Sequence, residues 1–224
     1  MVKHLVGIRS PTRHPRRRLH SRISASVKEY AQQAGLISWA SNNVQMNLQA
    51  MFCTLMLPHK FETTNAMWHA IKSDDGQRSL LLAVTKGAYQ PRSKFLASVI
   101  WAVDAAGKLA ALRNDAIHTA TTMQANRDRG WYVVPSEDWG QPARVERLNR
   151  LGHKKAFKLV FGDLNQLSEY THFLSVKAGA DPSVTLPRRP RLQAIPLLSK
   201  SPPKTSSRQQ RTQGRKRLRP ALRG

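Results

Sequence analysis

Cysteine is nearly absent from this 224-residue chain, and so is any long apolar run. The one thiol, Cys53, cannot form a disulfide within the chain, which excludes a disulfide-stapled scaffold and indicates a reducing, cytoplasmic setting. No uninterrupted apolar stretch reaches the roughly 20 residues that span a bilayer, and the basic N-terminal residues lack the apolar core of a secretory signal. We therefore expect a soluble protein with no membrane partner.

Metal-ligand spacings and glycine-rich phosphate loops are also missing. The histidines at 59, 69, 153 and 172 have no cysteine, histidine or carboxylate at the spacing of a zinc site. No loop of the Walker or Rossmann type occurs in the chain. The sequence therefore predicts neither a metal nor a nucleotide cofactor.

Acidic residues are absent from both flanks of the chain. Residues 1–22 contain seven lysines or arginines and residues 186–224 contain twelve, and neither segment has an acid. Flanks so rich in Pro, Ser, Gln and Arg cannot bury enough apolar surface to fold. We therefore predict a disordered basic tail at 1–22, a helical domain at 23–180, and a second disordered basic tail at 181–224.

Two parts of the sequence are candidate nucleic-acid contacts. Basic tails neutralise phosphates and release counterions, which gives affinity that depends on salt but not on sequence. The predicted tail contacts are Arg16, Arg17, Arg18, Arg215, Lys216 and Arg217. Trp131 and Tyr132, with Arg127 and Arg129 close by, are a candidate platform for an unpaired base. The alternatives are tails that only keep the protein soluble, a basic targeting segment at 1–22, and a tryptophan that packs back on the helices.

Apolar periodicity in the middle of the chain predicts helices. Capping-box spacing at Ser26 opens one long helix, in which Gly35 is a candidate bend, and Pro58 ends it. A short helix is expected near 62–73. A third helix follows an N-cap at Asp74-Asp75 and is ended by Gly87.

The rest of the middle region predicts a bundle with one interruption. Pro91 and Ser93 open a fourth helix, and a last helix is expected at about 156–178. Between them, residues 121–155 contain several helix breakers and one short candidate strand at 131–134. The fold class is therefore all-α: an antiparallel bundle of about four to five helices, with a short irregular or β excursion.

The fourth helix ends on the polar stretch LRNDAIHT, residues 112–119. With Val103 taken as the centre of its apolar face, that face extends to Asn114 and His118, Arg113 lies at its edge, and Asp115 points elsewhere. Buried polar groups are costly unless they are paired. These side chains therefore share a hydrogen-bond network, face a cleft, or meet a partner.

The run Arg113-Asn114-Asp115-Ala116-Ile117-His118 resembles the Arg-polar-x-x-x-His motif of the HEPN superfamily of small all-α domains. The order of helices around it, over about residues 26–178, is similar as well. The resemblance implies a metal-independent endoribonuclease, usually a homodimer in which these residues of two protomers face each other. His118 would act as general acid or base, Arg113 would stabilise the phosphorane charge, and Asn114 would orient His118.

The resemblance also implies a toxin or defence factor, for which an antitoxin protein is an expected partner. Two other interpretations stay open from sequence alone. The protein could instead bind RNA or DNA through its basic tails without cleaving it. LRNDAIHT could also be purely structural, with His118 complementing the negative end of the helix dipole and Arg113 paired with an acid elsewhere in the bundle.

Overall fold

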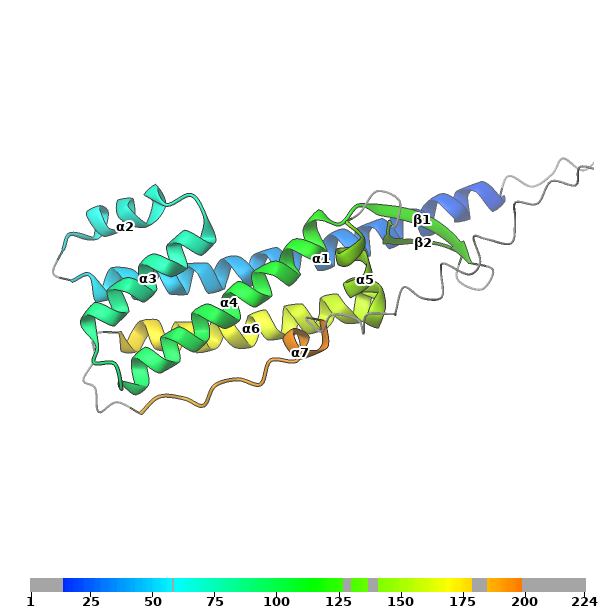
Figure 1. The fold of residues 1–224 in the computed structure, drawn as a ribbon. Helices are drawn as coiled ribbons and strands as arrows, with labels where there is room; N and C mark the ends of the chain where they lie inside the picture. The colour runs from blue at the N-terminus through cyan, green and yellow to red at the C-terminus, as the bar shows by residue number, and fades with distance from the viewer. Residues whose placement is uncertain (1–13, 58, 127–129, 137–140, 179–184, 199–224) are drawn as a thin grey trace, which may run out of the picture.

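The computed structural model describes residues 14–57, 59–126, 130–136, 141–178 and 185–198 (Figure 1). The described part contains seven helices and one two-stranded sheet. In chain order they are α1 (His14–Leu55), α2 (Phe61–Ala70), α3 (Asp74–Ala88), α4 (Lys94–His118), β1 (Thr121–Asn126), β2 (Gly130–Pro135), α5 (Pro142–Leu151), α6 (His153–Lys177) and α7 (Ala194–Leu198). The predicted mostly-α class is confirmed, with two more helices than the upper end of the expected number.

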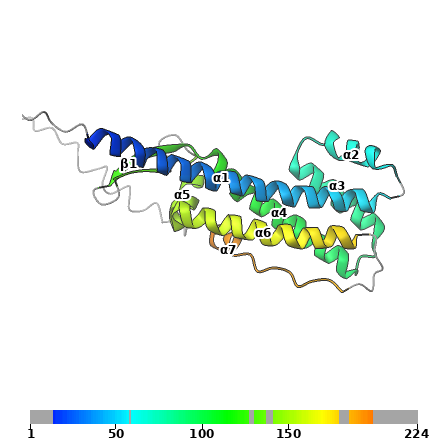
Figure 2. The same cartoon turned by 180° about the vertical axis from the view of Figure 1, so that it is seen from behind.

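Three long helices, α1, α4 and α6, lie side by side along the molecule (Figures 1 and 2). α4 runs antiparallel to the other two, as expected. α1 and α6 instead run parallel, since Glu29 meets Lys154 near their beginnings and Asn47 meets Ser168 further along both. The hairpin and α5 carry the chain from the end of α4 to the start of α6, which allows this parallel pairing.

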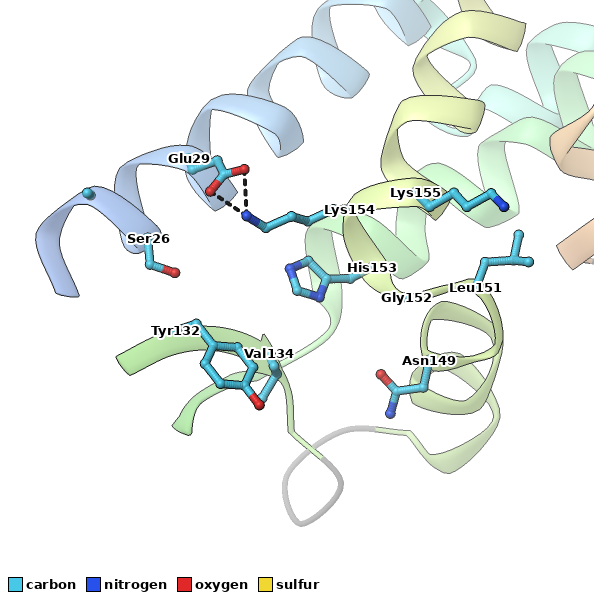
Figure 3. A pocket seen from close by; sticks show the side chains of 11 residues that line it. Ser26, Glu29, Tyr132, Val134, Asn149, Leu151, Gly152, His153, Lys154 and Lys155 are labelled. Carbon is cyan, nitrogen blue, oxygen red and sulfur yellow. Dashed lines mark hydrogen bonds and ion pairs between the residues drawn. The ribbon is translucent and has the colours of Figure 1, made fainter. Parts of the chain in front are cut away.

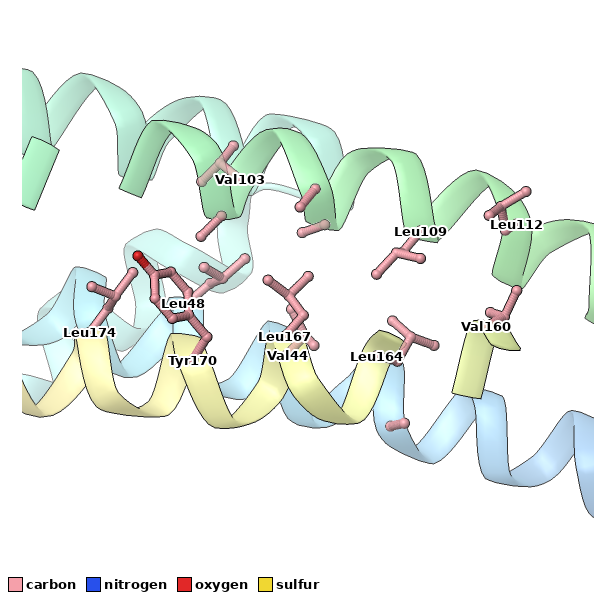
Figure 4. Close-up of a cluster of buried hydrophobic side chains, with 14 of the residues drawn as sticks. Val44, Leu48, Val103, Leu109, Leu112, Val160, Leu164, Leu167, Tyr170 and Leu174 are labelled. Carbon is pink, nitrogen blue, oxygen red and sulfur yellow. The ribbon is translucent and has the colours of Figure 1, made fainter. Parts of the chain in front are cut away.

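The core lies between these three helices (Figure 4). Its fully buried large side chains include Ile37, Leu48, Phe52, Leu81, Leu109, Leu164, Leu167 and Leu174. Layers of branched aliphatic side chains from all three helices exclude water, and burying each one fully stabilises the fold by about 1.5–3 kcal/mol.

The buried face of α4 differs in register from the face expected around Val103. It runs through Leu109, Leu112 and Ala116, whereas Ile117 is 37% exposed. α4 packs against α1, α3 and α6 together, so its buried arc is wider than one stripe and centred elsewhere. The shift buries Asp115, which was expected to point away from the core, and it leaves His118 exposed.

α1 begins at His14 rather than at Ser26. The helical backbone therefore covers residues 14–22, which were expected to be an unstructured tail. Pro15 stands in the first turn, where proline is tolerated, and no further proline or glycine follows until Gly35, through which the helix continues. Ser26 is consequently an interior residue, and its Oγ accepts the Val133 N–H at 2.9 Å instead of capping a helix.

The starts of α3 and α4 are fixed by serine caps. Ser73, one residue before the expected Asp74-Asp75 cap, accepts the Gly76 N–H at 3.1 Å. The two aspartates instead occupy the first turn, where they complement the positive end of the helix dipole. Ser93 caps α4 as predicted, by accepting the Phe95 N–H at 3.2 Å.

Part of the expected C-terminal tail packs on the bundle. The carboxylate of Asp163 on α6 accepts the N–H groups of Gln193 and Ala194 at 2.9 and 2.6 Å, and Leu198 is 1% exposed. Burial and the two hydrogen bonds act in opposite directions on the pKa of Asp163, and burial dominates and raises it. Residues 185–198 thus differ from the unstructured tail expected there, because they supply apolar side chains to the core.

An antiparallel hairpin follows α4. β1 pairs with β2 from Thr121↔Pro135 to Asn126↔Gly130. The predicted strand at 131–134 is therefore part of β2, and its partner β1 was not foreseen. The hairpin packs on the N-terminal half of α1, as Figure 1 shows, so it closes one side of the bundle at that end.

Among the described residues, α4 is the one helix long and apolar enough to cross a membrane. Averaging over 18 residues gives a mean hydropathy of 1.6, although polar residues interrupt the run. Fifty-six per cent of that window is buried inside the bundle. This position is that of a core helix.

Candidate nucleic-acid interface

The predicted catalytic arginine is held by a neighbouring helix. Arg113 Nη2 donates to Asp74 Oδ2 at 2.9 Å, and the Arg113 side chain is 22% exposed. Its Nε is buried and has no hydrogen-bond partner among the described groups. Asp74 belongs to the first turn of α3, so the guanidinium is directed toward α3.

The other two motif residues lie apart from that ion pair. His118 is the last residue of α4 and is exposed, and Asn114 is half-buried. Although Asn114 and His118 are one helical turn apart, no hydrogen bond joins them in the described part of the chain. Within one chain the structure therefore does not join Arg113, Asn114 and His118 into a hydrogen-bonded group.

The most strongly bound residue of the motif is one that the sequence interpretation set aside. Asp115 is 2% exposed and accepts two hydrogen bonds from Arg147 on α5, Nε to Oδ2 at 2.7 Å and Nη2 to Oδ1 at 2.8 Å. Arg144 Nε lies 3.6 Å from Oδ1. The hydrogen bond to Asp115 raises the pKa of Arg147 above its usual value. This bidentate pair fixes α5 against the end of α4.

An aromatic cluster joins α1 to the start of α6. The Tyr30 ring lies 5.8 Å from His153 and 5.2 Å from Phe157, and Tyr30 Oη donates to the Ala116 carbonyl at 3.3 Å. Burial raises the pKa of Tyr30 to about 12, so it remains a phenol. Burial, aided by Lys154 and opposed by Glu29, lowers the pKa of His153, which is therefore neutral at pH 7.

A cavity of about 690 Å³ opens in front of this cluster (Figure 3). We call it the first hollow. Its lining comes from α1, β2, α5 and the start of α6, and comprises Ala25, Ser26, Glu29, Tyr132, Val134, Asn149, Leu151, Gly152, His153, Lys154 and Lys155. Lys154 Nζ donates to both carboxylate oxygens of Glu29 at 2.7 and 2.6 Å, which ties the two helices together at its rim.

A second hollow of about 470 Å³ lies further along the groove between α1 and α6. It shares Glu29, Lys154 and Lys155 with the first hollow, and its other lining residues are Gln33, Leu36, Phe157, Lys158 and Phe161. The Oε1 atom of Gln33 is buried without a hydrogen-bond partner among the described groups. The two hollows therefore adjoin along one groove.

Positive charge gathers where the first hollow opens. Residues 142–161, which form α5 and the first turns of α6, contain six lysines or arginines and one acid, Glu146. The first turn of α6 has no acid and no capping side chain, but it includes Lys154 and Lys155. Cations at the positive end of a helix dipole repel it, and an anion bound there relieves that repulsion.

The other predicted nucleic-acid contacts are placed only in part. Arg16, Arg17 and Arg18 lie in the first turns of α1 and Trp131 lies in β2, but their side chains are outside what the structure describes. Arg127, Arg129, Arg215, Lys216 and Arg217 all lie outside the described residues. The lysines of α6 and the hollows beside them were not singled out from the sequence, because the parallel packing that creates the groove has no local sequence signal.

Neither a metal centre in the described part of the chain nor a match to a known protein indicates the function. The described residues contain no group of three or more His, Cys, Asp or Glu side chains arranged to hold a metal ion. Comparisons of the chain with protein-family models, with curated proteins and with solved structures gave no match. The function is therefore inferred from the residues of this chain alone.

Proposed function

We propose that the protein binds nucleic acid at the hairpin end of the bundle. The observation that carries the proposal is the first hollow, where Lys154 and Lys155 stand beside Tyr132 and His153 in a cavity of about 690 Å³. Proteins that bind single-stranded nucleic acid commonly place cations, which contact the phosphates, beside aromatic rings, which stack on the bases. A cavity of this size is also within the range of ordinary ligand sites, about 300–1,000 Å³.

The electrostatic part of the proposal follows from the charges around the hollow. Lys154 is engaged by Glu29, so its charge is partly offset, while Lys155 is exposed on the same rim. A phosphate bound at Lys155 also faces the uncapped start of α6. Each phosphate contact releases counterions, so affinity should fall steeply with salt.

The test is fluorescence anisotropy of the full chain with a labelled 20-nucleotide RNA over a salt series. Lys155→Ala should weaken binding several-fold and lower the salt slope by about one. Lys86→Ala, which removes an exposed lysine from α3, is the matched control and should leave both quantities unchanged. No binding at low salt, or equal losses in the two variants, would contradict the proposal.

A second candidate is the metal-independent ribonuclease implied by the HEPN resemblance. One observation favours it: His118 is exposed at the end of α4. A homodimer would have to bring Arg113 of one copy to His118 of the other. A role as toxin or defence factor, an antitoxin partner and a cytoplasmic location belong with this candidate.

Cleavage is tested with mixed RNA in EDTA, followed by analysis of the fragment ends. The candidate predicts 2′,3′-cyclic phosphate ends that are lost in His118→Ala. His172→Ala removes another exposed helical histidine, and it should cleave normally. Intact RNA with the unmodified protein, or equal cleavage by His118→Ala, would leave nucleic-acid binding as the function.

A further inference from the structure

We propose that the two hollows hold successive unpaired nucleotides, so that the protein prefers single-stranded to double-stranded nucleic acid. This inference rests on the proposed nucleic-acid binding and deepens it. It is carried by the continuity of the hollows, by their different linings, and by one buried polar atom that lacks a partner.

The two hollows form one path along α6. Lys155 lines both of them, and the Glu29–Lys154 ion pair stands at their shared boundary. Lys158 follows Lys155 by one turn, a rise of about 5 Å, and lines the second hollow. The cations thus track along the groove as the phosphates of a strand laid in it would.

The first hollow offers polar and aromatic groups to a base. Tyr132 and Asn149 reach it from β2 and α5, and neutral His153 lies at its inner side. A neutral imidazole has one donor and one acceptor nitrogen, and an amide has both donor and acceptor atoms. These groups can hydrogen-bond the edge of a base and lie against its face, which an anion site alone would not need.

The second hollow is more apolar and holds the unpartnered atom. Leu36, Phe157 and Phe161 contribute its apolar walls, and Gln33, whose Oε1 is buried without a partner among the described groups, is also a lining residue. A buried carbonyl without a hydrogen-bond partner is energetically unfavourable, so its presence needs an explanation. A base whose edge donates to Gln33 while its face lies on the apolar walls would satisfy that atom.

Both hollows require bases that are free of a complementary strand. Base edges that pair with a second strand cannot also bond Asn149 or Gln33 in the lining of a hollow, whereas duplex phosphates can still touch the exposed Lys155 and Lys158. Stacking on aromatic side chains likewise needs unstacked bases. The linings of the hollows therefore favour single-stranded over double-stranded nucleic acid, in addition to the attraction that the lysines exert on both.

Gln33→Leu separates this inference from a packing defect. If the unpaired Oε1 is only a flaw of packing, leucine removes the flaw, raises the melting temperature and leaves binding unchanged. If the amide contacts a base, leucine weakens single-strand binding although the protein is at least as stable. Gln32→Leu, a change at the exposed neighbouring position on α1, is the matched control.

The experiment measures affinities of the full chain for a labelled 12-nucleotide single-stranded RNA and for the same sequence as a duplex. We expect the single strand to bind about tenfold more tightly. Gln33→Leu and Tyr132→Ala should reduce that preference at least threefold, and Gln32→Leu should preserve it. A crosslink from 4-thiouridine in the strand to Tyr132 or a neighbouring hollow residue should accompany binding.

The possible results separate the single-strand preference from nucleic-acid binding itself. Equal, salt-sensitive binding of single strand and duplex, with Gln33→Leu indistinguishable from Gln32→Leu, overturns the single-strand inference and leaves nucleic-acid binding standing. No binding of either RNA at low salt overturns both.

Discussion

The two ends of the helical bundle differ in how their side chains pack. At the end formed by α2 and α3, the Trp68 ring packs on Phe52 with centroids 5.4 Å apart, and Gln77 donates to the carbonyls of Trp68 and Ile71. At the hairpin end, charged side chains surround two hollows, and the buried Oε1 of Gln33 has no partner among the described groups.

This comparison separates the part of the molecule that stabilises the fold from the part available to a ligand. At the α2–α3 end, which we call the closed end, aromatic packing and the hydrogen bonds of Gln77 hold the helices together, although Gln45 Oε1 is also buried there without a partner among the described groups. At the hairpin end, the ion pair of Asp115 and Arg147 fixes α5 against α4. Lys155, Lys158 and Tyr132 line the hollows. Changes at the closed end should therefore alter stability, and changes in the groove should alter binding.

Removal of the buried tryptophan at the closed end should have the largest effect on stability. Trp68 is 2% exposed, and Trp68→Ala should lower the free energy of unfolding by about 3–5 kcal/mol through lost burial and a cavity. Urea denaturation measures the loss. RNA affinity of the folded variant should stay within twofold of the unmodified value, and a large affinity loss in folded Trp68→Ala would break the comparison.

Loss of the buried carboxylate at the hairpin end comes next. Asp115→Ala removes the charged hydrogen bonds to Arg147, and it should cost about 1–3 kcal/mol, since the freed guanidinium can reach water. Asp104→Ala, in the same helix, loses only an exposed ion pair with Lys108 and should cost under about 1 kcal/mol. Equal melting temperatures for the two variants would show that Asp115 does not stabilise the packing of α5 on α4.

The pH dependence at the start of α6 should be smaller. Because the pKa of His153 is lowered in the folded protein, protons bind more strongly to the unfolded chain. Its contribution to stability is thus fully present above the unfolded pKa of about 6.5, and it is lost as pH falls toward the folded value. His153→Phe should reduce the stability loss between pH 7.5 and 5.5, while Gln32→Leu, at an exposed position of α1 that does not titrate, should not. Parallel stability curves for His153→Phe and the unmodified protein would refute this.

Helices were predictable where propensity and apolar period agree. The capping serine at 93 and the ends of α3 and α4 followed from local signals within a few residues. The structure of the expected tails was harder to predict. Their high charge indicated disorder, but the Arg-rich residues after Pro15 contain no helix breaker, and α1 therefore begins at His14. Residues 185–198 pack on the core through their apolar side chains, and Asp163, far away in sequence, binds the backbone at residues 193 and 194, so no local signal predicts this packing.

The candidate site was only partly predictable. The polar end of α4 was recognisable from the stretch 112–119, but an error of one position in the buried face exchanged the environments of Asp115 and His118. Arg147 and the lysines of α6 meet α4 and α1 only through tertiary packing. Periodicity within one helix carries no information on which partner a polar residue will find.

The most direct measurement compares charge reversal at the two ends of the bundle. Lys155→Glu with Lys158→Glu changes the groove, and Lys72→Glu with Lys86→Glu makes the same change in net charge around α3. Anisotropy with single-stranded RNA should show a loss of at least about tenfold for the groove pair and less than about threefold for the α3 pair. Equal losses for the two pairs would show that net charge alone drives binding and would contradict a nucleic-acid site at the hairpin end.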